Sequence, residues 1–207
     1  MLRPNGSKDY FREIDVEPYN TVLEASLSER GTYRFSTGEV YGDVSRMILD
    51  RHHWRAVRAG ERVSRRARTS TMRIVALAES YVTRGAATRA PLDVTIGRLA
   101  IHPISHPNQV SVASGFDVEL LFDGAPFAHM PFVLYEPTQS EEDVRRTFVT
   151  DEHGRAHIAF DHPGAYLTVV RFRTPAPANA GAAVLSYSTS LTFEVTTDTN
   201  LRDLRQH

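Results

Sequence analysis

Apolar and polar residues alternate with a period of two along most of the chain, and this period is typical of strands that are buried on one face. On either side of a short Gly-containing turn, TVLEASL from Thr21 and TYRFSTG from Thr32 both alternate, which predicts an antiparallel hairpin. Residues 46–57 predict two short strands or a strand and a bend, and residues 71–84 predict one long strand. An amphipathic helix over residues 44–49 is the alternative, although it would be too short to be stable without packing.

Residues 86–91 (AATRAP) interrupt the alternation with small residues and a proline, which is typical of a linker. Beyond this linker the alternation resumes in short runs about ten residues apart. The runs predict strands over 98–104, 116–122, 131–135, 147–150, 156–160, 165–173 and 184–195. Between them, Asp123-Gly124 and His153-Gly154 supply the residues that tight turns with positive φ angles require.

Seven short strands with regular turns predict an immunoglobulin-like sandwich, without the cysteine pair and core tryptophan of antibody domains. The predicted fold class is therefore all-β, with two β-sandwich domains. We place the N-terminal sandwich over residues 1–88 and the immunoglobulin-like sandwich over residues 89–196. Residues 197–207 form a polar tail, which we expect to be frayed.

Composition narrows the classes of function. The net charge of −1 is unevenly spread, because residues 1–95 contain 16 basic and 12 acidic side chains and residues 96–207 contain 8 and 13. Such a difference in charge can dock one half on the other or steer a charged partner.

The absence of cysteine excludes disulfides, thiolate metal sites and a cysteine nucleophile. No apolar stretch has the length of a membrane helix, and residues 1–10 lack the apolar core of a signal peptide. We therefore expect no membrane insertion, and export would require a signal that was removed or lies upstream.

Three groups of phrases, in this order along the chain, resemble one family. They are GTYR at Gly31 with YVTRGA at Tyr81; IHPISHPN at Ile101 with FDVELLFDG at Phe116; and TDEHGRA at Thr150 with PGAY at Pro163 and SYSTSL at Ser186. Over residues 25–196 the chain resembles the exported bacterial proteins of a numbered domain-of-unknown-function family, described as periplasmic components of nickel or cobalt uptake. The resemblance implies two β-sandwich domains, immunoglobulin-like or carboxypeptidase-regulatory-like, and a periplasmic location.

Members of that family begin, after signal cleavage, with a histidine-containing segment that ends in an aromatic residue. This segment is absent here. The resemblance therefore implies a chain that lacks its first strands or a divergent branch, without the N-terminal metal ligand suspected in the family.

Nine histidines make a metal site the first hypothesis for chemistry, because neutral imidazole binds nickel, cobalt, zinc and copper. His102 and His106 each precede a proline, so both lie in extended or turn backbone and would have to converge across a bend. His52 and His53 are adjacent, and on a strand only one of them can face a given site. We predict these four residues as metal ligands, and the alternative is that they are surface or turn-packing histidines.

Two other kinds of chemistry have less support in the sequence. No nucleophile-elbow phrase, P-loop, dinucleotide-binding turn or HExxH motif occurs, so we predict no catalytic activity. Residues 46–68 contain eight arginines, two acids and Trp54, which would suit either a nucleic-acid groove or a solvated hairpin. No second aromatic residue lies in this run, so we favour the hairpin and predict no nucleic-acid partner.

We therefore expect a non-catalytic periplasmic binding or accessory protein that supports the uptake of nickel, cobalt or iron. Its cofactor would be a transition-metal ion (Ni, Co, Zn or Cu), and its partners would be transporter or TonB-dependent receptor components. The alternative is a structural or adaptor β-sandwich module that uses sheet edges or loops to contact an outer-membrane receptor or transporter, without affinity for metals. Metal uptake rests on the resemblance alone, because a fold does not dictate a function.

Overall fold

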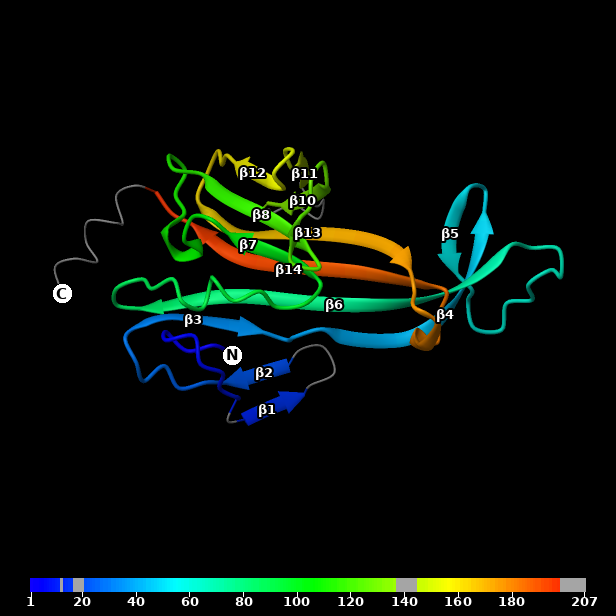
Figure 1. Cartoon of the computed structure of the whole chain (residues 1–207), viewed down its shortest axis with the longest axis horizontal. Coiled ribbons are helices and arrows are strands. Elements are labelled where there is room, and N and C mark those ends of the chain that lie inside the picture. The colour runs from blue at the N-terminus through cyan, green and yellow to red at the C-terminus, as the bar shows by residue number, and fades with distance from the viewer. Residues whose placement is uncertain (12, 17–20, 137–144, 198–207) are drawn as a thin grey trace.

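The computed structural model describes residues 1–11, 13–16, 21–136 and 145–197, and it confirms the prediction of an all-β chain (Figure 1). The N-terminal half contributes β1 (Glu13–Val16), β2 (Thr21–Glu24), β3 (Gly31–Ser36), β4 (Val40–Asp50), β5 (His53–Ala56) and β6 (Thr69–Arg84). The C-terminal half contributes β7 (Leu99–Pro103), β8 (Phe116–Phe122), β9 (Ala125–Pro126), β10 (Pro131–Tyr135), β11 (Arg145–Val149), β12 (Arg155–Ile158), β13 (Gly164–Pro175) and β14 (Val184–Val195). In these ranges the helical elements are η1 (Pro107–Gln109) and η2 (Ala178–Ala180), and neither is long enough to span a membrane.

An eight-stranded sheet runs along the molecule, and β6 is the strand that pairs with three others, β14, β4 and β3. One edge of β6 pairs in parallel with β14. The other edge pairs with β4 over the first part of β6 and with β3 over the last part. Beyond β14 the sheet continues through β13 and β10 to β11, and beyond β4 it ends at β5. The long strands reach past the smaller sheet, so β4 and β5 project at one end of the molecule (Figure 1).

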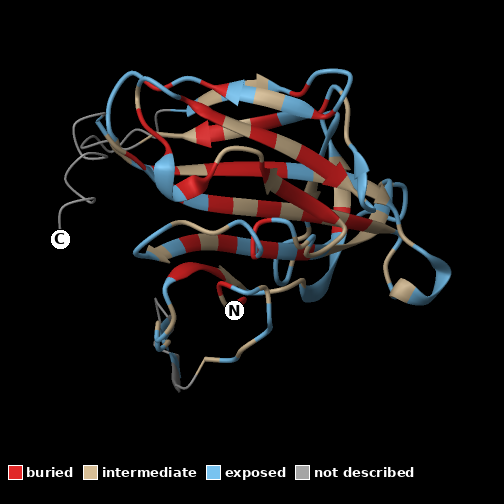
Figure 2. Ribbon diagram, turned by 60° about the vertical axis from the view of Figure 1, so that its left-hand side comes forward, coloured by how far each residue is buried: buried red, intermediate tan, exposed pale blue. Residues whose placement is uncertain are grey.

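A smaller sheet of β7, β8, β9 and β12 packs on the long sheet and encloses the core (Figure 2). Its central strand, β8, alternates in burial: Phe116, Val118 and Leu120 are buried, whereas Asp117 and Glu119 are partly exposed. The buried side chains of β8 belong to one hydrophobic cluster with those of β10, β13 and β14. Since side chains alternate between faces, the outer face of β8 presents its carboxylates away from the core.

Most of the predicted strands are confirmed. β8, β10 and β14 have the predicted bounds, and the long strand expected over residues 71–84 is β6. Residues 44–49 belong to β4 and form no helix. The hairpin expected over residues 21–38 is wrong, because β2 pairs with β1 and β3 pairs with β6. Residues 31–34 of β3 are buried on both faces, so β3 needs the central strand β6 as its neighbour, whereas the apolar side chains of β2 remain exposed.

The long sheet crosses the predicted domain boundary at residue 88. Its strands β3, β4, β5 and β6 precede this boundary in the sequence, whereas β10, β11, β13 and β14 follow it. Side chains from both parts form one core. The predicted division therefore does not separate two sheets in this structure. The immunoglobulin-like arrangement of residues 89–196 stays a prediction, and the expected polar tail lies, from residue 198 onward, outside the described residues.

The segment that follows β6 is fixed to the sheet by a buried ion pair. Arg34 of β3 binds Glu79 of β6 through two hydrogen bonds of 2.9 and 2.7 Å, and both side chains are nearly inaccessible to solvent. The Arg34 guanidinium also donates to the carbonyl oxygens of Pro91 and Val94. The predicted linker is consequently anchored at its C-terminal end, Pro91.

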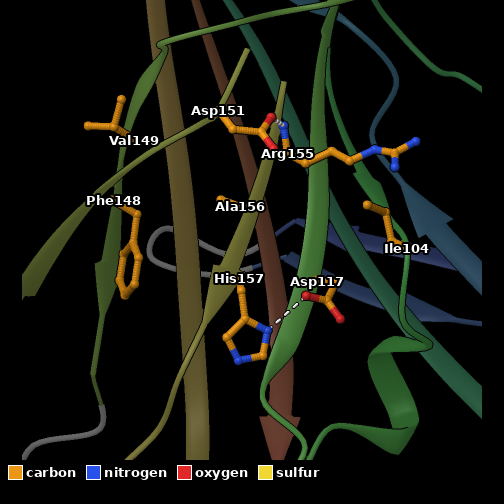
Figure 3. A pocket seen from close by; sticks show the side chains of 8 residues that line it. All are labelled: Ile104, Asp117, Phe148, Val149, Asp151, Arg155, Ala156 and His157. Atoms are coloured by element: carbon orange, nitrogen blue, oxygen red, sulfur yellow. Dashed lines mark hydrogen bonds and ion pairs between the residues drawn. The ribbon is translucent and has the colours of Figure 1, made fainter. Parts of the chain in front are cut away.

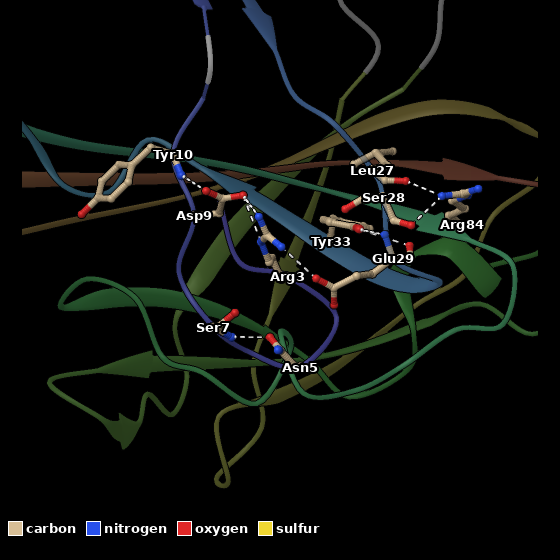
Figure 4. Close-up of polar contacts among 10 residues, drawn as sticks. All are labelled: Arg3, Asn5, Ser7, Asp9, Tyr10, Leu27, Ser28, Glu29, Tyr33 and Arg84. Carbon is tan, nitrogen blue, oxygen red and sulfur yellow. Dashed lines mark hydrogen bonds and ion pairs between the residues drawn. The ribbon is translucent and has the colours of Figure 1, made fainter.

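The N-terminal segment lies against β3 (Figure 4). The Leu2 N–H donates to the Arg34 carbonyl at 2.8 Å, and the Arg34 N–H donates to the Leu2 carbonyl at 3.1 Å. Arg3 binds the carboxylates of Asp9 and Glu29 at 2.6 and 2.8 Å. These ion pairs are partly exposed and add little stability, so the burial of Leu2 contributes more to holding the segment.

Candidate functional site

A hollow of about 540 Å³ opens beside β12, on the outside of the smaller sheet (Figure 3). It is lined by Ile104, Asp117, Phe148, Val149, Asp151, Arg155, Ala156 and His157. The lining comes from the outer face of β8, from the edge strands β11 and β12 with the turn between them, and from Ile104, which follows β7. It combines carboxylates, an imidazole and a guanidinium with an aromatic ring, so it can form both polar and apolar contacts.

The pairing of β8 with β12 determines which side chains meet on this face. The Leu120 N–H donates to the Gly154 carbonyl at 2.8 Å, which makes these two residues a hydrogen-bonded pair of the ladder. Hydrogen-bonded and non-hydrogen-bonded pairs alternate in an antiparallel ladder. Glu119 and Arg155, and then Asp117 and His157, are therefore non-hydrogen-bonded pairs, in which side chains lie closest. Each pair places a carboxylate beside a basic side chain.

His157 is held in one orientation by Asp117. The distance between His157 Nδ1 and Asp117 Oδ1 is 2.8 Å, and both side chains are about half exposed (Figure 3). The imidazole ring lies against Gly115, where an added Cβ would be 2.4 Å from His157 Cε1. The carboxylate accepts a hydrogen bond from the Nδ1–H, so Nε2 keeps its lone pair when the ring is neutral. The pair thus presents an oriented acceptor at the surface.

His102, one of the predicted ligands, lies in the neighbouring row of the same face. It is opposite Glu119 in the β7–β8 ladder, and Glu119 Oε1 lies 3.3 Å from Arg155 Nε. Burial lowers the pKa of His102, against the opposing effect of the Glu119 carboxylate. This row therefore contains an imidazole, a carboxylate and a guanidinium.

The backbone of β12 has an edge that faces away from β8. The Arg155 N–H donates to Asp151 Oδ1 and the Arg155 carbonyl accepts from the Asp151 N–H, both at 2.8 Å. The hydrogen bond from the Arg155 N–H lowers the pKa of Asp151. His157 is two residues further along β12, so its N–H and carbonyl point away from β8, as those of Arg155 do. Among the described residues these two groups have no hydrogen-bond partner, and they lie beside the hollow.

Residues 1–174 match a protein family described as a domain of unknown function, DUF4198. The chain belongs to this family. The match includes both sides of the predicted boundary and every residue that lines the hollow. No curated protein and no solved structure matches this DUF4198 chain.

His106 occupies a structural position in this DUF4198 protein. Its Nδ1 accepts the Asn108 N–H at 3.2 Å, so the hydrogen of the neutral ring is on Nε2, which lies 2.9 Å from Thr32 Oγ1. Burial lowers the pKa of His106. Both ring nitrogens therefore have partners, and the side chain joins η1 to β3.

His52 lies in the exposed turn between β4 and β5, where Arg51 and His52 have φ angles of 45° and 75°, and His53 is the exposed first residue of β5. Figure 1 shows β5 at the projecting end, far from β7 and its His102. The structure therefore does not bring the four predicted ligands together. Within the described ranges, no group of three or more His, Asp or Glu side chains is placed to hold a metal ion.

The pattern of the sequence did not predict the Asp117–His157 pair. Both residues lie in strands that were predicted, but the pairing of these strands is a property of the fold. In the sequence, both residues occupy polar positions of strands with alternating apolar and polar residues, which indicates only that they face away from the core. That signal becomes specific only when the β8–β12 register is known.

Proposed function

We propose that the protein is a non-catalytic accessory protein of the periplasm, which holds an extended segment of a partner protein against the free edge of β12. The observation that supports this proposal is the His157 backbone, whose N–H and carbonyl have no hydrogen-bond partner among the described residues. They lie beside the hollow between the two edge strands β11 and β12. An extended peptide can add to such an edge through main-chain hydrogen bonds. A transporter or receptor component with an exposed strand would be a suitable partner.

The side chains around the edge can provide selectivity. In β-strand addition, main-chain bonds give affinity while pockets for alternate side chains select the sequence. Phe148 and Val149 offer apolar contacts on the β11 side, and Arg155 and His157 offer polar ones on the β12 side. A bound segment would therefore alternate apolar and polar residues.

Displayed random peptides, selected on the wild-type protein, provide the probe for this proposal. The affinity of a selected peptide would be measured by fluorescence anisotropy for wild type, His157→Pro and His157→Ala. Proline removes the N–H at an edge position where it is otherwise tolerated, and alanine keeps it. We expect His157→Pro to lose about tenfold in affinity, the equivalent of one hydrogen bond, and His157→Ala to lose less.

Circular dichroism would establish that both variants keep the strand content of the wild type. Equal affinity of the wild type and the His157→Pro variant would contradict strand addition at this edge. Failure to select any peptide that competes for the hollow would contradict the proposal as well.

Transition-metal binding in support of nickel, cobalt or iron uptake is the second candidate, and the Asp117–His157 pair favours it. A carboxylate that orients an imidazole is a common outer-shell arrangement at metal sites. The described residues supply only this imidazole and nearby carboxylates, so a partner or solvent would complete the coordination. Calorimetric titration with Ni²⁺, Co²⁺, Zn²⁺ and Cu²⁺ tests this candidate. Binding should be tighter than about millimolar and lost in His157→Ala; weaker binding, below about 4 kcal/mol, would exclude it.

A further inference from the structure

Positive charge gathers at the projecting end of the molecule. This tip consists of residues 46–68, which contain the end of β4, the strand β5 and the loop to β6. It contains eight arginines, Arg46, Arg51, Arg55, Arg58, Arg62, Arg65, Arg66 and Arg68, and two acids, Asp50 and Glu61. The tip is strongly cationic in a chain whose net charge is only −1.

The acids of the tip neutralise one arginine only. Arg55 Nε lies 3.0 Å from Asp50 Oδ2, and Arg55 Nη2 lies 2.7 Å from Glu61 Oε1. The other seven arginines are exposed and make no ion pair with any described residue. Their charges add to a field directed outward, because exposed like charges within a Debye length of about 8–10 Å reinforce one another.

Apolar side chains accompany this charge. Trp54 on β5 is 38% exposed. At the base of the tip is a hollow of about 310 Å³, on the side of the sheet that Trp54 faces. Met47, Met72, Pro175 and Val184 are among the residues that line it with Trp54. Cations around an exposed tryptophan and a small apolar surface are typical of proteins that lie on anionic bilayers.

The shape of the tip favours an anionic bilayer over a nucleic acid as the partner. Figure 1 shows a narrow hairpin and loop that extend beyond the two-layered part of the molecule. Single-stranded nucleic acids are bound in grooves that track the backbone, on successive aromatic platforms. Trp54 is the only aromatic residue in residues 46–68, so the tip offers no row of successive aromatic platforms. A flat anionic surface fits it better.

We propose that the tip, residues 46–68, docks the protein on the anionic surface of a lipid bilayer, with the arginines on lipid phosphates and Trp54 in the interface. Figure 1 shows β5 well separated from β11 and β12, so the edge of β12 stays accessible to a partner when the tip is docked. The inference is independent of the proposed function.

Trp54 is the only tryptophan in the chain, so tryptophan fluorescence, excited selectively over the tyrosines, reports on the tip alone. The wild type would be titrated with vesicles of equal parts phosphatidylglycerol and phosphatidylcholine, and with phosphatidylcholine alone. We expect binding and a blue shift of Trp54 only with the anionic vesicles, and reversal by high salt.

A tip variant with Arg62→Gln, Arg65→Gln and Arg66→Gln should bind about a hundredfold more weakly, since each arginine near an anionic surface is worth about fivefold. The matched control replaces Arg30, Arg145 and Arg171 by Gln, which are exposed elsewhere and change the net charge equally. The control should bind as the wild type does. Equal loss in both variants, vesicle binding without a shift of Trp54, tighter binding to a single-stranded oligonucleotide than to anionic vesicles, or no vesicle binding would each overturn the inference.

Discussion

The ion pair between Arg34 and Glu79 is the most deeply buried charged contact described, with side-chain exposures of 2% and 0%. Removing one partner of such a pair leaves an uncompensated charge in the interior. We therefore predict that Glu79→Gln lowers the free energy of unfolding by about 3 kcal/mol, measured by urea denaturation. The double variant Arg34→Met/Glu79→Leu should lose less, because no charge remains buried. A loss below about 1 kcal/mol in Glu79→Gln would show that the pair behaves like an exposed one.

His106 gives the fold a dependence on pH. Its pKa is lowered by burial, and so is that of His102, which means that the unfolded chain binds these protons more readily than the folded chain. Their contribution to stability is complete above the unfolded pKa of about 6.5 and is lost as pH falls through the folded pKa. The urea midpoint should therefore fall between pH 7 and pH 5, and the fall should be smaller in His106→Gln. In the control His153→Gln, at an exposed turn, the fall should equal that of the wild type; an unchanged slope in His106→Gln would refute this role.

At the scale of residues, the sequence identified histidines as the residues of interest but not their roles. His106 was predicted as a metal ligand because its type and spacing allow it. Its partners, Thr32 and Asn108, lie on different elements, and no local pattern brings Thr32 to it across 74 positions. His157 has a carboxylate partner 40 positions away. Side-chain roles of this kind depend on tertiary contacts that alternation does not encode.

The turn between β11 and β12 depends on Gly154. Its φ is +76°, and an added Cβ would lie 2.7 Å from the Phe127 nitrogen, which is backbone and cannot move aside. Gly124, at the β8–β9 turn, has φ +78° and nothing within 4 Å of the same position. Gly124→Ala therefore isolates the cost of the positive φ, about 1 kcal/mol. Gly154→Ala should cost clearly more in urea denaturation, and equal losses would contradict the steric account.

At the scale of elements, prediction from the sequence was most accurate where alternation and turn residues are local. The bounds of β8, β10 and β14 were predicted correctly, because alternation within each strand and the residues beside it are enough to define them. The partner of β3 was predicted wrongly, because an adjacent strand is the default expectation and β3 instead pairs with β6, with Gly31 opposite Arg84. β3 pairs with β6 because its residues are buried on both faces. That burial depends on the N-terminal segment and on residues 88–94, which contact β3.

At the scale of the whole molecule, the two halves depend on each other. β14 pairs with β6 over nine positions in parallel, and Val75 and Tyr81 of β6 belong to the common core. A fragment of residues 89–197 would lose these side chains and expose one edge of β14. We predict that it shows no cooperative urea transition, in contrast to the full chain. A cooperative transition and dispersed amide resonances in the fragment would support the division at residue 88 after all.

The organisation of the whole molecule could not be predicted from strand patterns, because the strongest signals divide the chain at the linker. The sheet instead joins strands more than a hundred positions apart in the sequence, as Met72 and Val184 are. The projecting tip also results from this long sheet: β4 and β6 extend beyond the smaller sheet, so no described strand of the smaller sheet covers β5. The charge of the tip was evident in the sequence, but its position in space was not.

Hydrogen exchange of individual amides tests the central claim, the free edge of β12, most directly. In the free protein the His157 amide should exchange quickly and the Ala156 amide, directed at β8, slowly. When a selected peptide is added, His157 should become protected while Ala156 stays as it was. Strong protection of His157 in the free protein, or no change when the peptide binds, would contradict the account.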